Sequence, residues 1–283
     1  MIKIVADSTC DLSPEIIEKT NITISPTYVV SNDKYYKDGV DIAPEDVFKI
    51  FETEGAACKT TAANVYDYEE IYSEYASEYD DIIQICIGSE FSCCYQNACI
   101  AAKSFKNVHV INSVNLSTGF GYLVYEAALM AKDGTDAETI CKKIEGTVPY
   151  IDTSFVINKL DYLYKGGRCS GLEAIGAMLF NIKPCIEVLN GKMDVGRKYR
   201  GKLEQCIEKY IKDRFENNGD IDYKRVFVTH SLRSDEILNN AIELIKGYAN
   251  FEEIITTTAG CAVSTHCGPN TLGVIYKRKT PKK

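Results

Sequence analysis

The chain has 283 residues, of which 45% are hydrophobic and 25% are charged, and its formal net charge is −8. These values allow one large domain or two smaller ones with a core that folds without disulfides, and the acidic balance argues against a nucleic-acid partner. No run of about 18 apolar residues occurs, and the N-terminus lacks a signal-peptide pattern, so we expect a cytoplasmic protein without stable membrane insertion.

The first half of the chain alternates predicted strands with predicted helices. Short apolar runs indicate the strands, and Ser13 followed by Pro14 gives one helix a suitable cap and first residue. Continuously apolar strands separated by helices predict a parallel sheet covered on both faces. The predicted strands are 2–8, 22–30, 81–88 and 107–113, and the predicted helices are 13–20, 43–51, 67–79, 92–105 and 119–134.

The second half has a different pattern. Asn190–Gly191 separates two segments of alternating polarity, which is a typical hairpin signal and predicts antiparallel strands. The chain is therefore expected to form two α/β domains, residues 1–150 with a mainly parallel sheet and residues 151–283 with a mixed sheet. Other predicted strands begin at 154 and cover 225–231, 252–260 and 271–278, and the predicted helices are 172–180, 202–219 and 235–249.

Twelve cysteines raise the question of a metal site or of disulfides. No C-x-x-C pair occurs, although zinc and iron–sulfur sites depend on such close pairs. Most cysteines stand at apolar positions, as Cys86 and Cys206 do, where a free thiol packs as a small hydrophobic group. We expect reduced structural thiols and no metal ion, with a reactive thiol as the alternative.

Four loops of the first half are rich in Ser and Thr. Each could serve only to cap a helix, but together, near the ends of parallel strands, they predict a polar pocket for an anionic or hydroxylated head group. These loops are DSTCD at 7–11, CKTTAAN at 58–64, GSEFSCC at 88–94 and NSVNLSTG at 112–119.

Two segments of the second half also carry candidate chemistry. KGGRCSG places Arg168 on a double-glycine turn, where a bidentate cation could bind phosphate or an acidic partner. STHCGPNTLG places His266 in an expected loop. The G-x-S-x-G and P-loop motifs are absent and G-x-G-x-x-G is incomplete, so no nucleotide cofactor or nucleophile-elbow hydrolase is predicted.

In this order and spacing, these segments match the motifs of one family over essentially the whole chain. The sequence resembles the DegV family of bacterial lipid-binding proteins, which includes the fatty-acid-binding subunit of fatty acid kinase. It departs from the family pattern at Cys93–Cys94, where Gly–Thr is usual, at 61–64, and at Asn112 and Asn270. The matching segments are IVADSTCDLS, KTTAAN, SEFSCCYQNA, DYLYKGGRCS, Arg200–Gly201 and VSTHCGPNTLG.

The resemblance implies a lipid carrier without enzymatic activity of its own. Two α/β domains would clamp a long-chain fatty acid in an apolar tunnel, with its carboxylate on Thr60, Ser92 and His266. A separate Dak-type kinase subunit would phosphorylate the bound carboxylate, and the chain itself would need no cofactor. Supporting ligand positions would be Thr61, Cys93, Ser117, Thr265 and Gly268, and positions for the partner or phosphoryl transfer would be Arg168 and Arg200.

Two other functions stay open from the residues alone. The first is an acyl hydrolase or acyltransferase that uses Ser92 or Cys93 with His266. The second is a carrier of another amphiphilic acid, because the residues that line an apolar tunnel are the same as those of a core.

Overall fold

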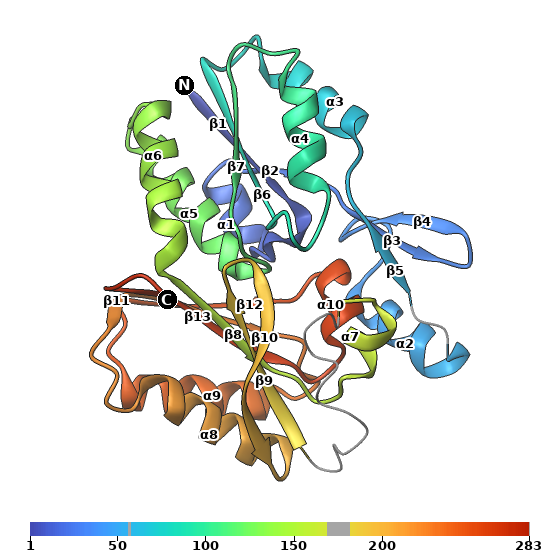
Figure 1. Cartoon of the computed structure of the whole chain (residues 1–283), viewed down its shortest axis with the longest axis vertical. Coiled ribbons are helices and arrows are strands. Elements are labelled where there is room, and N and C mark those ends of the chain that lie inside the picture. Colours follow the sequence, from blue (N-terminus) through green and yellow to red (C-terminus); the bar gives the residue numbers. More distant parts are fainter. Residues whose placement is uncertain (56–57, 169–181, 283) are drawn as a thin grey trace.

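The computed structural model describes residues 1–55, 58–168 and 182–282. Its first large sheet has four parallel strands in the order β2-β1-β6-β7 (Figure 1). This arrangement confirms the parallel sheet expected for the first half. Its strands are β1 (Ile2–Asp7), β2 (Thr23–Ser25), β6 (Asp81–Cys86) and β7 (Val108–Asn112).

Helices cover both faces of this sheet, with α3 and α4 on one side and α5 and α6 on the other (Figure 1). Ser13 caps the first helix by accepting a hydrogen bond from the Ile16 backbone N–H, and Asn64 caps α3 in the same way. The helices of this part are α1 (Pro14–Lys19), α3 (Val65–Tyr75), α4 (Cys94–Ala102), α5 (Thr118–Lys132) and α6 (Ala137–Thr147), with short 3₁₀ turns η1 (Ser8–Cys10) and η2 (Val148–Tyr150).

A small antiparallel sheet interrupts this pattern between residues 28 and 61. Residues 22–30, expected as one strand, divide at Pro26 into two strands of different sheets, because proline lacks the N–H that a ladder needs. The small sheet has the order β4-β3-β5 and packs with α2 against α10. These elements are β3 (Tyr28–Ser31), β4 (Lys34–Lys37), β5 (Lys59–Thr61), α2 (Pro44–Glu54) and α10 (Cys261–Cys267).

The second large sheet has six strands in the order β10-β9-β8-β13-β11-β12. Neighbours are antiparallel except β11 and β12, which confirms the mixed sheet. Asn190 and Gly191 both have positive φ at the β9–β10 turn, as the hairpin prediction requires. The strands are β8 (Ile151–Val156), β9 (Ile182–Leu189), β10 (Lys192–Arg200), β11 (Ile221–His230), β12 (Glu253–Thr258) and β13 (Leu272–Arg278).

Helices α8 (Leu203–Phe215) and α9 (Asp235–Tyr248) lie together on one side of this sheet (Figure 1), and α7 (Asp161–Lys165) follows β8. Helix α5 lies between the two large sheets and contacts strands of both. The predicted helix 172–180 lies outside the described residues. Among the described helices, none combines the length and the apolar character that crossing a membrane requires.

The two halves of the chain share buried contacts. Ile151, Phe227 and Ile275 belong to the same hydrophobic cluster as the four-stranded sheet, and Arg225 pairs with Glu126 across the halves. The chain enters the six-stranded sheet at Ile151, and the predicted division at residue 150 stays a prediction.

Candidate functional site

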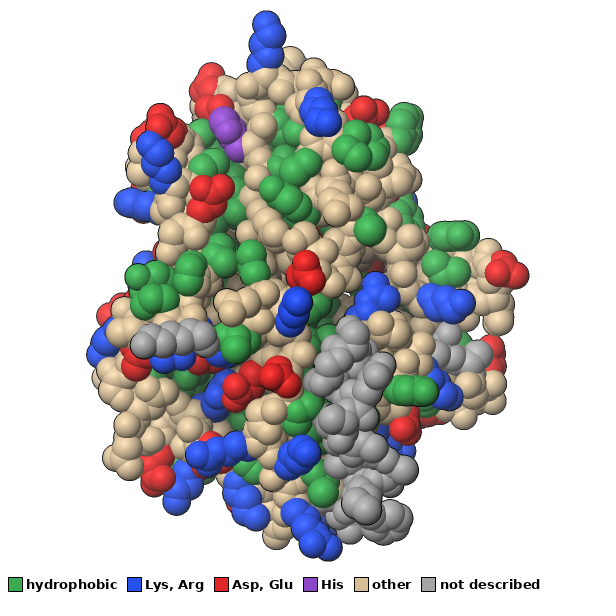
Figure 2. Space-filling model, in the orientation of Figure 1, with side chains coloured by type: hydrophobic (Ala, Val, Ile, Leu, Met, Phe, Trp, Pro, Cys, Tyr) green, Lys and Arg blue, Asp and Glu red, His purple; other side chains and the backbone are tan. Residues whose placement is uncertain are grey.

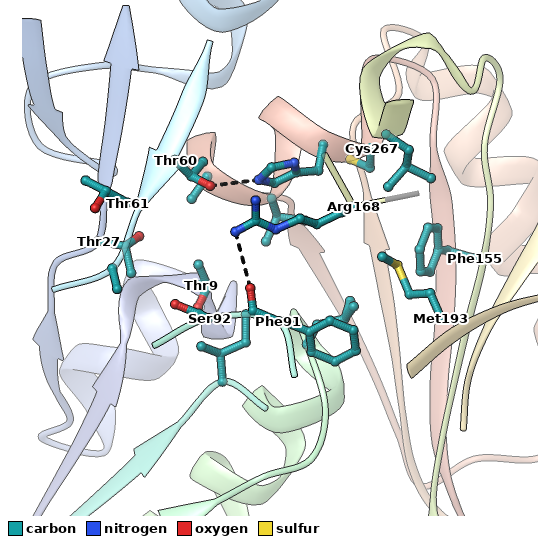
Figure 3. Close-up of a pocket in the computed structure, with 17 residues that line it drawn as sticks. Thr9, Thr27, Thr60, Thr61, Phe91, Ser92, Phe155, Arg168, Met193 and Cys267 are labelled. Atoms are coloured by element: carbon teal, nitrogen blue, oxygen red, sulfur yellow. Dashed lines mark hydrogen bonds between the residues drawn. The ribbon is translucent and has the colours of Figure 1, made fainter. Parts of the chain in front are cut away.

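A pocket of about 710 Å³, part of it open to solvent, lies where the two large sheets and the small sheet meet. Figure 3 shows the labelled Thr and Ser side chains on one side, Phe155, Met193 and Cys267 on the other, and the Arg168 side chain extending between them. The polar lining residues are Thr9, Thr27, Thr60, Thr61, Ser92, Arg168 and His266. The remaining lining residues are Ala62, Ile87, Phe91, Leu116, Phe155, Leu163, Met193, Ala262, Val263 and Cys267.

Thr60 and His266 meet across this pocket from opposite halves of the chain. Thr60 pairs with Val29 in the small sheet, on the face that packs against α10. His266 stands in the last turn of α10, and its Nε2 lies 2.8 Å from Thr60 Oγ1. The run around His266 was expected to be a loop, and that expectation is wrong, because residues 261–267 form a helix.

The imidazole of His266 is held neutral. Burial, together with the positive charge of Arg168, lowers its pKa to about 3. Its Nδ1 is buried and has no hydrogen-bond partner within the described part of the chain. Gly166 packs against that nitrogen so closely that an added Cβ would lie 2.3 Å away. A neutral ring carries one N–H, so one nitrogen donates and the other accepts.

Ser92 lies just before α4, on the loop that follows β6. Its Oγ accepts a hydrogen bond from the Cys94 backbone N–H at 3.3 Å and donates to Cys94 Sγ at 3.1 Å. The positive end of the α4 dipole therefore lies beside a hydroxyl at the pocket, an arrangement that favours an anion.

Arg168 contributes the positive charge of the pocket. It follows Gly167, whose φ of +69° suits glycine, and the guanidinium donates to the carbonyl oxygens of Gly166 and Phe91 at 3.3 and 3.4 Å. The bond to Phe91 connects the second half of the chain to the loop before Ser92. Figure 2 shows Lys and Arg side chains near the middle of this face of the molecule.

An outer cleft opens from the polar side of the pocket. The residues that it shares with the pocket are Thr60, Thr61, Ala62, Phe91, Ser92, Arg168 and Met193, and it also includes the exposed Cys93. Four of these seven shared residues are polar, so the cleft opens mainly onto the polar side of the pocket.

A deeper chamber of about 390 Å³ adjoins the pocket on the apolar side and shares Leu116, Phe155, Val263 and Cys267 with it. Several Ser and Thr residues also line this chamber, but apart from Thr153 their hydroxyls bond to protein groups, so mostly carbon atoms face the space. Examples are Ser117 to Asp11, Ser231 to the Gly268 carbonyl and Thr271 to the Cys267 carbonyl.

The structure separates the other predicted site residues. Thr61 lines the pocket and Ser117 lines the deeper chamber. Thr265 is buried within α10 and donates to the Cys261 carbonyl, and Gly268 packs against the Tyr162 ring. Arg200 is exposed at the end of β10 and lines none of these cavities.

Two polar pocket residues and one residue behind them were not predicted individually. Thr9 belongs to one of the four polar loops, and its hydroxyl is buried without a hydrogen-bond partner among the described residues. Thr27 lies in a run that reads only as a strand. Asp38 contacts the N-terminus of α10 from a segment without any recognisable motif.

Buried carboxyl groups lie near the pocket. Burial raises the pKa of Asp7 to about 7, although the Ile87 N–H and the Tyr68 hydroxyl favour its charged form. Burial also raises the pKa of Asp11 to about 8, opposed by bonds from Ser117 and the Gly260 N–H. Within the described residues, no three His, Cys, Asp or Glu side chains come together as a metal site.

The burial of most described cysteines agrees with the predicted packing role. The eleven described cysteines are unbridged, and eight of them are buried. Burial raises the pKa of Cys94 to about 12, so this thiol stays protonated and unreactive at neutral pH.

Comparisons with known proteins find relatives that match nearly the whole length of this chain. The model of the DegV family, described as an uncharacterised protein family, matches residues 1–279. A DegV domain-containing protein of Caldanaerobacter subterraneus is 34% identical over 98% of this chain and 99% of its own length. A fatty-acid-binding DegV family protein from Thermus thermophilus has a TM-score of 0.88 and 26% identity, covering 98% of this chain and 99% of that one. A stearic acid-binding protein from Eubacterium ventriosum has a TM-score of 0.84 and 25% identity, covering 99% of both.

Proposed function

The chain belongs to the DegV family. On that premise we propose that it binds a long-chain fatty acid and presents the carboxylate to a separate kinase subunit, which forms an acyl phosphate. One observation carries the proposal: a single pocket combines a polar end at Thr60, Ser92 and His266, which opens into the outer cleft beside Thr60 and Ser92, with an apolar wall that leads to the deeper chamber.

The three polar residues suit a carboxylate. The hydroxyls of Thr60 and Ser92 each carry a donor, and neutral His266 has one N–H to offer or to orient Thr60. A bound carboxylate would bring a negative charge to a site that already holds the Arg168 guanidinium. Hydrogen bonds to a charged group contribute ~1.5–3 kcal/mol each.

The apolar side suits the acyl chain, which would run past Leu116 and Phe155 toward the deeper chamber. About fifteen buried carbon groups at ~0.8 kcal/mol each contribute roughly 12 kcal/mol before the costs of association. Because the chain contributes more than the head group, it should dominate retention and the polar residues should set the position of the carboxylate.

The open polar end suits presentation to a partner. A kinase needs access to the carboxylate from solvent while the acyl chain stays buried. The outer cleft includes Thr60 and Ser92, two of the proposed carboxylate ligands. Arg168 is at the rim of that cleft, where it could contact a transferred phosphoryl group or the partner. The proposed kinase reaction uses ATP, and the described cysteines are free thiols; both support a cytoplasmic location.

The contacts favour carriage over hydrolysis. A serine or cysteine nucleophile needs a base within hydrogen-bonding reach. His266 Nε2 is instead bonded to Thr60, and the Ser92 hydroxyl is bonded to Cys94.

Denaturing extraction of the purified protein followed by mass spectrometry tests the proposal. We expect a long-chain fatty acid in near-stoichiometric amount. A protein that is empty and that also fails to take up palmitate or oleate would exclude the carrier function. Release of free acid from acyl esters by the protein alone would favour the hydrolase.

Arg168→Ala tests presentation. With a Dak-type kinase subunit, ATP and Mg²⁺, we expect unchanged fatty-acid content and slower acyl-phosphate formation. Arg197→Ala is the matched control, because Arg197 is an exposed arginine on β10 that pairs with Asp213 and lines none of the cavities. Equal rates for the two variants would remove Arg168 from the presentation step.

A further inference from the structure

Helix α10 depends on outside contacts for its position. It has only seven residues, and isolated helices of that length do not persist in water. One of its faces nevertheless supplies Ala262, Val263, His266 and Cys267 to the pocket. Whatever fixes α10 therefore fixes the imidazole beside Thr60.

Asp38 holds the N-terminal end of this helix from a segment 223 residues away in the chain. Its Oδ1 accepts hydrogen bonds from the Cys261 and Ala262 N–H groups at 2.8 and 3.3 Å. Its Oδ2 accepts from the Ser8 and Thr27 hydroxyls at 2.8 and 3.3 Å. Because four donors bond to one buried carboxyl group, the orientation of α10 relative to Ser8 and Thr27 is fixed.

Two of these four donors belong to residues of the pocket wall, Thr27 and Ala262. Asp38 itself does not line the pocket, so it acts from behind the wall. Asp11 completes the contact by accepting from the Gly260 N–H at 2.8 Å. A Cβ on Gly260 would lie 3.0 Å from an Asp11 oxygen and 3.4 Å from an Asp38 oxygen, so the glycine lets both carboxyl groups approach.

We propose that Asp38 is a positioning residue for the head-group end of the pocket. It fixes α10 and Thr27 together, and so keeps His266 Nε2 within hydrogen-bonding reach of Thr60 Oγ1. Its effect on the ligand rests on the proposed function, whereas its effect on the imidazole concerns the protein alone. Loss of Asp38 should displace the carboxylate site more than it weakens retention of the acyl chain.

The three histidines of the chain permit a direct test by ¹⁵N NMR of the imidazole nitrogens. The protein is measured after lipid removal and again with palmitate labelled with ¹³C at the carboxyl carbon. In Asp38→Ala we expect the His266 resonances and the bound carboxyl resonance to move, with palmitate affinity reduced less than about tenfold because chain burial dominates. His109 serves as the internal reference, since it lies on β7 and pairs with Asp81.

Asp136→Ala is the matched control. Asp136 caps α6 through the Thr139 N–H and hydroxyl, so its loss also removes an aspartate cap, but from a helix that lines none of these cavities. We expect lower thermal stability with unmoved His266 and carboxyl resonances. Equal displacement in the two variants would assign Asp38 a general stabilising role and overturn the proposal.

Unmoved His266 and carboxyl resonances in a folded Asp38→Ala protein would also overturn it. If Asp38→Ala does not fold, Asp38→Glu decides, because it keeps the charge and displaces the carboxyl group by one methylene. Movement of the His266 resonances in that variant supports positioning, and unmoved resonances refute it. Failure of the wild type to bind palmitate would instead count against the proposed function, while the lipid-free histidine spectra would still test Asp38.

Discussion

Replacing His266 with Gln should make the protein more resistant to acid relative to wild type. Burial lowers the pKa of this imidazole to about 3 in the folded protein, whereas an unfolded histidine has a pKa of ~6.5. Between these values the unfolded chain takes up a proton that the folded protein refuses. The contribution of His266 to stability is therefore complete above pH ~6.5 and is lost as the pH falls toward 3.

The magnitude follows from the width of that window. Each pH unit within it costs at most ~1.4 kcal/mol, so two units below the unfolded pKa, at pH ~4.5, the loss approaches ~2.7 kcal/mol. That is a large part of the ~5–15 kcal/mol by which domains are usually stable. Glutamine does not titrate, and its amide can still bond to the Thr60 hydroxyl.

Urea unfolding of the lipid-free proteins at pH 7.5 and 4.5 measures the effect. The difference in unfolding free energy between His266→Gln and wild type should shift by about 2–3 kcal/mol in favour of the variant as the pH falls. Asp7 and Asp11 titrate in both proteins, so their contributions cancel in the difference. A difference that stays constant between the two pH values would refute a neutral, buried imidazole.

Three further changes test other contacts. Burial raises the pKa of Asp11 to about 8, so its stabilising contribution is complete below pH ~3.8 and is lost as the pH rises through 8. The melting temperature of Asp11→Asn should therefore rise relative to that of wild type between pH 5 and 8. Gly166→Ala places a Cβ 2.3 Å from His266 Nδ1 and should cost about 1–3 kcal/mol in urea unfolding, whereas Gly146→Ala, where a Cβ meets nothing within 4 Å, should cost nothing. Ala259→Leu fills part of the deeper chamber and should shift the extracted fatty acids toward shorter chains by mass spectrometry; an unchanged chain profile would place the acyl tail elsewhere.

Much of the fold could be predicted from local patterns. The parallel strands of the first half are continuous apolar runs, and the β9–β10 hairpin carries Asn190–Gly191, so periodicity and turn chemistry determine both. The small sheet was missed because β4 and β5 are short and polar, and even in the folded protein only Tyr36 and Thr60 of these two strands are half-buried. Helix α10 was missed because its cap is not in its own sequence but on Asp38 and Asp11.

The residues of the candidate site likewise fall into those that local motifs predict and those that depend on long-range contacts. Thr60, Ser92 and His266 could be named because ordered motifs surround them, and the structure brings all three to one pocket. Thr27 and Asp38 could not be named. Asp38 matters through its contact with Cys261, more than two hundred positions away, and Thr27 matters because it lines the pocket. The pKa of His266 was equally out of reach, since it depends on burial and on the approach of Arg168.

The packing of the small sheet against α10 has a consequence for how such chains can be recombined. Val29, Ile42, Val47 and Cys58 form one cluster with Cys261, so a segment from early in the gene is matched to one from its end. A chimera that joins residues 1–150 of one relative to the remainder of another would place this contact between two parents. If residues 27–61 and 259–268 are exchanged together, both surfaces of this contact come from the same parent protein.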